Sequence, residues 1–282
     1  MTAPPLFIGV VSHAASTYSM SQGPDGLGQQ LASALPDTNL GVNVIDLLPA
    51  NSPLVSSRGV QASLAAERRL EVAWGQYLER PTDLRWWRSR AYRWALRGQQ
   101  RMRPPAPAML RRLLNIEMSH LDLMRRGLDS GAPWVLILED DATSSDIRDL
   151  SEGLEALMGW SGGPAFVNLS HSFTPQELGI RHLLTTVEGH RWEGSASRTI
   201  FEARKPVTNT VCAILYRAAF LKRLVAAMEA LPMEPVVPID WKLNQALKSM
   251  HASGQVQAGK CWLVEPAPIR QMSMHSPEIL PS

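Results

Sequence analysis

The stretch WVLILEDDA, residues 134–142, constrains the fold of this chain more than any other. Five apolar residues lead directly into three carboxylates, Glu139, Asp140 and Asp141. A short continuous apolar run is typical of a strand that is buried on both faces of a sheet. Carboxylates at the end of such a strand repel one another beside a low-dielectric interior, so the fold must supply something that compensates their charge.

The remaining periodicity predicts an α/β fold with a mostly parallel sheet. The apolar run LFIGVV at 6–11 is followed by a Gly/Ser-rich loop, a short helix at 29–35 and a strand, VNVIDLL, at 42–48. This strand–helix–strand order favours parallel pairing with crossover helices. We expect further strands at 165–169 and 211–216, and further helices at 64–78, 108–128 and 220–231. The segment 174–205 is polar and has no clear period, so it receives no assignment.

Length and charge limit the class of protein. The chain has 282 residues and 45% hydrophobic content, enough for a large core, and we expect one domain over 1–282. A formal charge of +2 does not indicate a general polyanion binder, so we expect no nucleic acid partner. Cys212 and Cys261 are flanked by apolar residues, as buried thiols of a reducing compartment would be. The amino terminus has no signal-peptide pattern and no apolar run reaches transmembrane length, which predicts a soluble, cytoplasmic protein.

Residues 84–103, LRWWRSRAYRWALRGQQRMR, concentrate arginine and tryptophan within a predicted helical insertion at 50–107. On a helix, four arginines share one stripe and the apolar residues another; these arginines are Arg90, Arg93, Arg97 and Arg101. One interpretation is peripheral contact with an anionic membrane surface, or with an anionic substrate. The other is an insertion whose tryptophans pack on the domain and whose arginines are solvated. The sequence leaves both open.

The acidic triplet has a chemical interpretation and a structural one. Alternation along a strand sends Glu139 and Asp141 to one side and Asp140 to the other. Two carboxylates on one side suit a divalent cation such as Mn²⁺ or Mg²⁺, which can in turn hold a diphosphate at the carboxyl end of the sheet. The alternative is a solvated acidic loop that opens the next helix.

The block MSHLDLMRRGLDSGAPWVLILEDDA, residues 118–142, resembles glycosyltransferase family 25, which includes lipooligosaccharide β-galactosyltransferases and collagen galactosyltransferases. The shared features are the Ser119-His120 pair on a helix and the apolar strand that ends in Leu-Glu-Asp-Asp. Weaker similarity covers AFVNLS, VCAILYRAAFLKRL, VPIDWKLNQAL and EPAPIRQMS, in the same order. The chain departs from the family pattern at 112–116, RLLNI, and in the loop after the first strand.

The resemblance implies a GT-A-type fold and an enzyme that transfers a sugar from a nucleotide-sugar donor to a saccharide or lipid-linked cell-envelope acceptor. It also implies that the transfer inverts the anomeric configuration of the sugar. It assigns Asp141 as the metal ligand and Glu139 as a partner that contacts metal, ribose or sugar. Asp140 would face the hydroxyls of the sugar. Ser119 and His120 would take a structural or donor-binding role. The metal would neutralise charge on the leaving diphosphate.

Two residues downstream complete the predicted site. An inverting transfer needs a base for the acceptor hydroxyl, and Asp240 in Pro-Ile-Asp-Trp is our candidate, since apolar neighbours can raise its pKa. Asp240 can also serve as a helix cap, and the two roles are compatible. His275, near the carboxyl terminus, is a candidate for an additional metal ligand.

Two other function classes remain open at this point. A metal-dependent phosphoryl-transfer enzyme also uses clustered carboxylates, although two-metal chemistry needs more of them than the sequence clearly supplies. A non-catalytic relative could bind a glycan through the same fold, against which the intact acidic triplet and Asp240 argue.

Overall fold

The structure is a computed structural model. It describes residues 5–12, 26–35, 37–43, 47, 52, 54–79, 107–170, 174–176, 178–208 and 210–272. Two predictions from the sequence, the Arg/Trp segment at 84–103 and the metal ligand His275, lie outside these residues.

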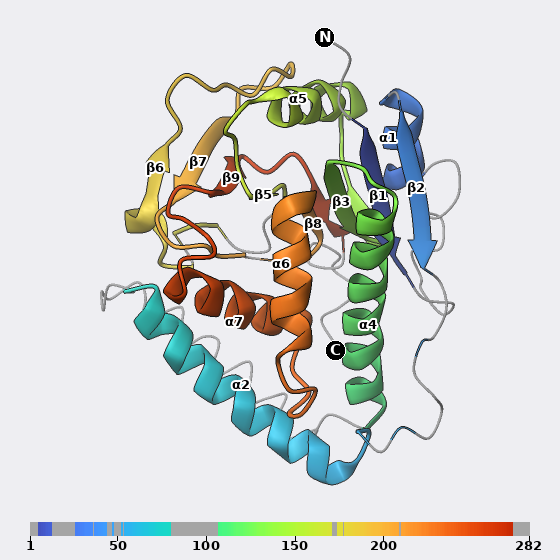
Figure 1. The fold of residues 1–282 in the computed structure, drawn as a ribbon, viewed down its shortest axis with the longest axis vertical. Helices are drawn as coiled ribbons and strands as arrows, with labels where there is room; N and C mark the ends of the chain where they lie inside the picture. Colours follow the sequence, from blue (N-terminus) through green and yellow to red (C-terminus); the bar gives the residue numbers. More distant parts are fainter. Residues whose placement is uncertain are drawn as a thin grey trace, which may run out of the picture.

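The described residues form an α/β fold around a mixed, mostly parallel sheet of eight strands. The strand order is β2-β1-β3-β8-β5-β9-β7-β6 (Figure 1). Six of these strands run in one direction, and only β7 and β8 run in the other. The bounds are β1 Leu6–Val11, β2 Thr38–Asn43, β3 Trp134–Glu139, β5 Phe166–Asn168, β6 Leu184–Thr186, β7 Thr199–Ala203, β8 Ala213–Arg217 and β9 Cys261–Glu265.

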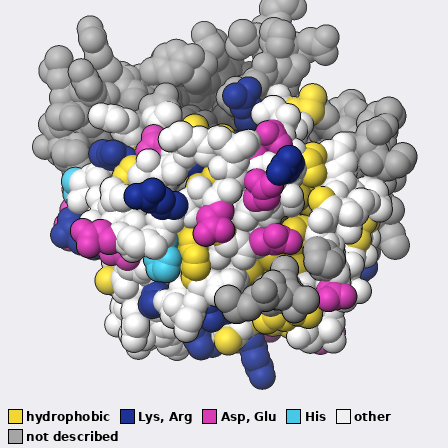
Figure 2. Space-filling model, turned by 90° about the horizontal axis from the view of Figure 1, so that it is seen from above, with side chains coloured by type: hydrophobic (Ala, Val, Ile, Leu, Met, Phe, Trp, Pro, Cys, Tyr) yellow, Lys and Arg dark blue, Asp and Glu magenta, His cyan; other side chains and the backbone are white. Residues whose placement is uncertain are grey.

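Helices cover both faces of this sheet. One face packs against α4 (Pro107–Asp129), α6 (Ala218–Glu229) and α7 (Ile239–Ala252), and the other against α1 (Leu27–Ala34) and α5 (Ile147–Gly159). The long helix α2 (Ser57–Tyr77) crosses outside α7 and reaches the amino-terminal end of α4 (Figure 1). Seen from above, over α5, the surface carries interspersed acidic and basic side chains without a field of one sign (Figure 2).

The strand β3 confirms the prediction of a central strand buried on both faces. It lies between β1 and β8. Val135 and Ile137 belong to the hydrophobic cluster under α4 and α6, whereas Leu136 and Leu138 belong to the cluster under α5. All four side chains are at most 1% exposed. A strand without a solvent face has no place for polar residues, which explains why the run is continuous.

Helix α4 packs very closely on β1 and β3, because glycine leaves room at the contact. A Cβ atom at Gly127 would lie 2.7 Å from Cγ1 of Val135. A Cβ atom at Gly9 would lie 2.8 Å from Cδ1 of Ile137 and 3.1 Å from Cβ of Leu123. This close approach fixes α4, and the His120 side chain that it carries, against the sheet.

Three predictions about the sheet were wrong or incomplete. The second strand is Thr38–Asn43 and begins four residues before the predicted range 42–48, because it pairs with β1 in the register Leu6 to Thr38. Residues 44–46 and 48 of that prediction lie outside the described residues. It is an edge strand with partly exposed residues, so it needs no continuous apolar run. The unassigned segment 174–205 supplies β6 and β7. The strand β9 was not predicted at all.

Candidate metal and acid–base site at the end of β3

The three carboxylates lie where β3 ends and the chain turns. Glu139 is the last residue of β3, and Asp140 and Asp141 form a turn that leads into the short strand β4 (Ala142–Thr143). The strand β4 pairs with β10 (Arg270–Gln271), and the backbone N–H of Met272 donates to the carbonyl of Asp141 at 2.9 Å. The carboxyl-terminal part of the chain is thereby held beside the acidic turn.

Glu139, Asp141 and Cys212 form a group that could hold a metal ion. One ligand atom from each residue lies within 4.8 Å of the others. The Sγ atom of Cys212 lies 3.9 Å from Oδ1 of Asp141. Asp141 is 6% exposed and Cys212 is fully buried. Asp140 does not belong to this group. Glu139 and Asp141 therefore lie together as predicted, although β3 ends at Glu139 and a turn, not strand alternation, places Asp141.

The thiol of Cys212 carries its proton when no cation is bound. Burial raises the pKa of Cys212 well above its ordinary value, and the charges of Glu139 and Asp141 raise it further. A divalent cation would reverse this balance, because it stabilises the thiolate and both carboxylates together. The donor set therefore fits a metal ion: two carboxylates suit Mn²⁺ or Mg²⁺, and a thiol extends the range to softer ions.

Two side chains from distant parts of the chain hold Glu139. The Nε2 atom of Gln271 donates to Oε2 of Glu139 at 3.1 Å. The Nε2 atom of His120 lies 3.6 Å from Oε1 of the same carboxylate. His120 is 1% exposed, and its Nε2 has no hydrogen-bond partner among the described residues. If this buried nitrogen carries the proton, it can donate to the carboxylate once Glu139 shifts slightly on binding a ligand.

Asp140 makes a separate contact. Its Oδ2 accepts a hydrogen bond of 2.9 Å from the Oγ of Ser12, which follows the last residue of β1. The carboxylate thus points toward the end of the neighbouring strand. This position connects the acidic turn with the carboxyl end of β1.

Asp240 lies in the first turn of α7 and interacts electrostatically with the acidic turn. Burial raises its pKa to about 6, and the charges of Glu139 and Glu67 add to this effect. Backbone N–H groups of Trp241 and of Asp240 itself lower the pKa, but by less. Asp240 does not occupy the N-cap position predicted for it, because Pro238 is the N-cap residue of α7 and no side chain makes a cap hydrogen bond there. Its raised pKa is the property that a base in this place would need.

The structure thus brings most of the predicted site residues together and adds two more, Cys212 and Gln271. Ser119 is buried beside His120 on α4, but the contacts of the described residues do not join it to Glu139. Cys212 and Gln271 were missed. Cys212 lies in the apolar run VCAILY and resembles a core residue. Because β8 is antiparallel to β3, however, the residue before β8 lies opposite the end of β3. The backbone N–H of Glu139 donates to the carbonyl of Cys212 at 2.8 Å.

A buried ion pair links the helix of His120 to the helix of Asp240. The Nζ atom of Lys242 lies 2.8 Å from Oε1 and 2.7 Å from Oε2 of Glu117. Both side chains are less than 10% exposed. Glu117 lies three residues before His120, and Lys242 lies two residues after Asp240. The pair therefore fixes α7 against α4 close to the site.

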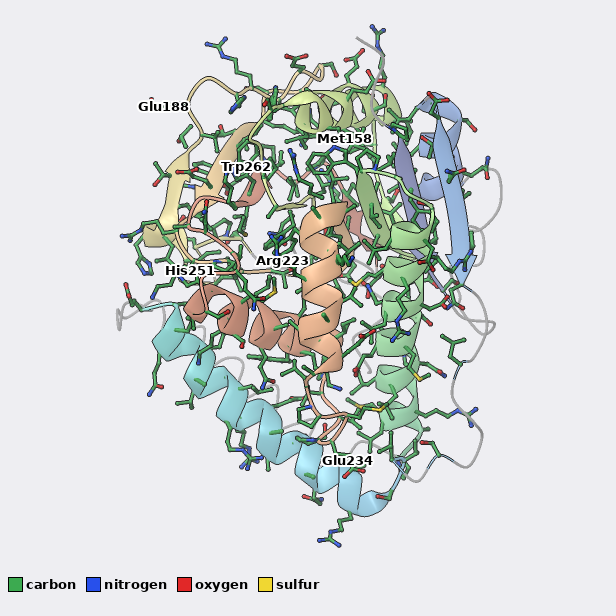
Figure 3. The ribbon with its side chains drawn as sticks, viewed as in Figure 1. Met158, Glu188, Arg223, Glu234, His251 and Trp262 are labelled. Carbon is green, nitrogen blue, oxygen red and sulfur yellow. The ribbon has the colours of Figure 1, made fainter. Side chains whose placement is uncertain are left out.

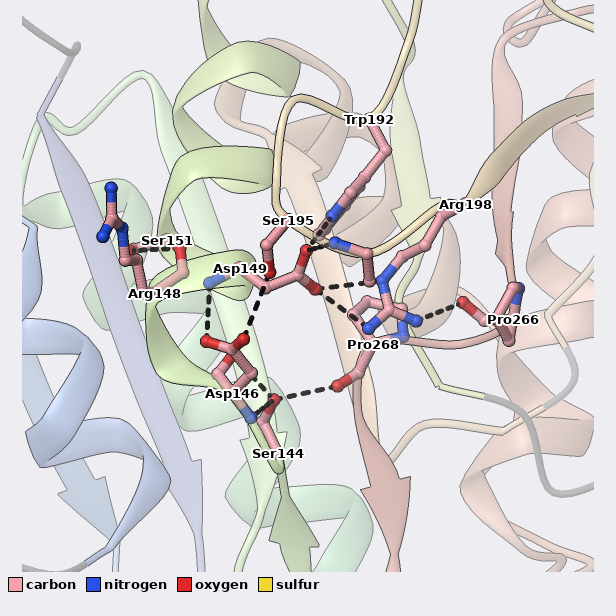
Figure 4. A network of polar contacts seen from close by, with 11 residues as sticks. Ser144, Asp146, Arg148, Asp149, Ser151, Trp192, Ser195, Arg198, Pro266 and Pro268 are labelled. Carbon is pink, nitrogen blue, oxygen red and sulfur yellow. Dashed lines mark hydrogen bonds and ion pairs between the residues drawn. The ribbon is translucent and has the colours of Figure 1, made fainter.

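A second buried carboxylate, Asp149, belongs to a separate network (Figure 4). It accepts hydrogen bonds from the Trp192 indole at 3.0 Å, the Ala196 backbone at 2.8 Å and the Arg198 guanidinium at 2.9 and 3.1 Å. Arg198 also donates to the carbonyl of Pro266 at 2.8 Å. Burial raises the pKa of Asp149, but these donors together lower it below its ordinary value. The network ties the 192–198 loop to α5 and leaves no oxygen free for a ligand.

The comparisons with known proteins add no family. No model of a known protein family matches the chain, and no curated protein matches it. Among the helices of the described residues, none is long and apolar enough to cross a bilayer.

Proposed function

We propose that the protein is a metal-dependent glycosyltransferase that transfers a sugar from a nucleotide-sugar donor to a hydroxyl group of an acceptor. The observation that carries the proposal is that a possible cation site and a carboxyl group of raised pKa interact at one end of the sheet. Glu139 and Asp141 lie with Cys212 in a group that could bind a cation, and the charge of Glu139 contributes to the raised pKa of Asp240. A cation site and an acid–base group are the two components that this transfer requires.

The GT-A-type fold belongs to the same proposal. An α/β sheet with helices on both faces and acidic residues at the carboxyl end of a central strand supports it. The resemblance of residues 118–142 to glycosyltransferase family 25 supports it as well. The acceptor, a saccharide or a lipid-linked cell-envelope molecule, is an expectation of that resemblance.

Each residue of the cation site would have its own role in the reaction. Asp141 and Glu139 would hold Mn²⁺ or Mg²⁺, which supplies charge neutralisation to the diphosphate that leaves. His120 and Gln271 keep Glu139 in place, since each has a nitrogen near one of its oxygens. Asp140, held by Ser12, is placed to accept hydrogen bonds from hydroxyl groups of the donor.

Asp240 would accept the proton of the acceptor hydroxyl. A carboxylate with a pKa of about 6 is mostly ionised at neutral pH and is a stronger base than an ordinary aspartate. Its position in the first turn of α7, which the Glu117–Lys242 pair fixes against α4, keeps it at a constant place relative to Glu139. Trp241, partly buried next to it, can contact a sugar ring.

A thermal-shift screen of nucleotide sugars tests the proposal without knowledge of the acceptor. Each nucleotide sugar is added with Mn²⁺ or with EDTA, because a ligand of the folded state raises the melting temperature by mass action. The proposal expects at least one nucleotide sugar to raise it in Mn²⁺ and not in EDTA. If no nucleotide sugar does so, the proposal is wrong. The proposal is also wrong if each nucleotide sugar gives the same melting temperature in EDTA as in Mn²⁺.

A further inference from the structure

An open cavity on the surface at the opposite end of the sheet has three basic side chains in its lining. It has a volume of about 540 Å³ and lies where β8 ends, α6 begins, and β5 and β9 start. The basic residues that line it are Arg217, Arg223 and Lys260, and no acidic residue lines it. The volume lies within the range of roughly 300 to 1,000 Å³ that is usual for small-molecule sites.

None of these cations is neutralised by a carboxylate in the part of the chain that the structure describes. Arg217 donates from Nη2 to the carbonyl of Trp160 at 3.3 Å, and its guanidinium lies 4.7 Å from the centre of the Trp134 ring. Its Nε is buried without a hydrogen-bond partner among the described residues. Lys260 donates from Nζ to the carbonyl of Gly162 at 2.6 Å. These contacts hold two cations in place and leave their charge uncompensated.

The beginning of α6 adds to the positive potential of the cavity. Ala219 and Phe220, in the first turn of this 12-residue helix, line the cavity. The N-cap residue makes no side-chain cap hydrogen bond, and no acidic residue lies in the first turn. The partial positive charge of the helix therefore points at the same space as the three basic side chains. Arg223 follows one turn later on α6 and extends from the side away from α4 (Figure 3).

We infer that this cavity binds a phosphate ester, with the phosphate group between Arg217, Arg223 and the first turn of α6. Guanidinium groups and helix amino termini are both preferred phosphate ligands. The amide side chains of Gln255 and Gln257, which also line the cavity, can bind hydroxyl groups of the rest of the molecule. A small sugar phosphate has this combination of chemistry and size. The site is independent of the acidic turn, which lies at the other end of β3.

Binding of glucose 6-phosphate in EDTA, measured by calorimetry, tests this inference. The Asp141→Asn variant serves as the background, so that binding at the acidic turn does not contribute. Arg223 is exposed and its replacement by Gln removes one phosphate contact, so Arg223→Gln should weaken binding about tenfold or more. The matched control is Lys222→Gln, the exposed neighbour on the same helix that does not line the cavity, which should bind as the background does.

Vesicles that contain phosphatidic acid, compared with neutral vesicles, form the second arm. They present the same phosphate group as a lipid headgroup. If Arg223→Gln loses glucose 6-phosphate binding but keeps vesicle binding, the cavity binds a soluble ester. If Arg223→Gln loses vesicle binding but keeps glucose 6-phosphate binding, the cavity binds the lipid headgroup. Absence of binding to both probes overturns the inference, and so does equal binding by Arg223→Gln and Lys222→Gln.

Discussion

The Nε2 atom of His120 lies 3.6 Å from Oε1 of Glu139, in a place that is closed to solvent. No other described group bonds this nitrogen. A proton on Nε2 could therefore be donated to the carboxylate and would orient Glu139 for a cation that Asp141 and Cys212 could also hold.

Replacement of His120 by Asn should weaken Mn²⁺ binding about 10- to 100-fold, because Glu139 loses the group that orients it. The measurement is a calorimetric titration with Mn²⁺ at pH 7.5, accompanied by a melting curve. The control is His251→Asn on α7, whose ring contacts the Val256 carbonyl and not the site. Equal Mn²⁺ affinity of His120→Asn and the control would exclude this role of His120.

The Glu117–Lys242 pair predicts a large cost for breaking it and a small cost for removing it. Lys242→Met leaves a charged Glu117 buried at the interface of α4 and α7, which should cost about 3 to 5 kcal/mol of unfolding free energy. The double variant Glu117→Leu/Lys242→Met should recover most of this loss. Urea denaturation gives both values. A double variant as unstable as Lys242→Met would show that the pair does not account for the loss.

The exposed pair Arg148–Glu152 provides the control for that cycle. Both residues lie on the surface of α5, and the Arg148 side chain is 86% exposed. Arg148→Met should leave the urea midpoint nearly unchanged, because water and salt screen exposed pairs.

Asp240 should make the protein less stable at neutral pH than an uncharged residue would. Its pKa is about 6 in the folded protein and 3.8 by ordinary value, so the folded state binds the proton more tightly. Stability is therefore lost as the pH rises from about 4 to above 6, by an amount on the order of 2 to 3 kcal/mol. Asp240→Asn should be more stable than the parent at pH 8 in EDTA. Melting curves from pH 4 to pH 8 would refute this if the difference did not grow with pH.

Asp149 should matter for the fold and not for the site. Asp149→Asn removes the charge that the Trp192 indole, the Ala196 backbone N–H and Arg198 compensate, at a cost of about 3 kcal/mol or more. Because its folded pKa is lowered, this contribution is present above the unfolded pKa and is lost as the pH falls through the folded one. Mn²⁺ affinity should remain unchanged at a temperature where the variant is folded. A weaker affinity would connect the network with the acidic turn.

Buried strands and amphipathic helices could be predicted because their patterns are local. The strand 6–11 and the helix bounds of α4 and α6 follow the sequence within two residues or so. Strands such as β2 and β6, which have a polar face or only a few residues, could not be predicted. Their pairing depends on neighbours that are distant in the sequence. The strand β9, CWLVE, carries an apolar run that could have identified it.

The same distinction holds for the site. The acidic turn could be predicted from the apolar run before it, and Asp240 from its apolar neighbours. Cys212 could not, because its place opposite Glu139 follows from the antiparallel pairing of β8 with β3. Gln271 depends in the same way on the pairing of β10 with β4. Side chains that meet only through tertiary pairing leave no spacing pattern in the sequence.

The most direct test of the central claim is the Mn²⁺-dependent binding of a nucleotide sugar by the protein and by Asp141→Asn. The control is Asp129→Asn, an exposed carboxylate at the end of α4. The nucleotide sugar that responds in the thermal-shift screen is titrated with Mn²⁺ present and, separately, in EDTA. The account predicts that Mn²⁺ strengthens binding at least tenfold in the parent and in Asp129→Asn, and that Asp141→Asn abolishes this effect while it melts as a folded protein. An unchanged effect of Mn²⁺ in Asp141→Asn would contradict the account.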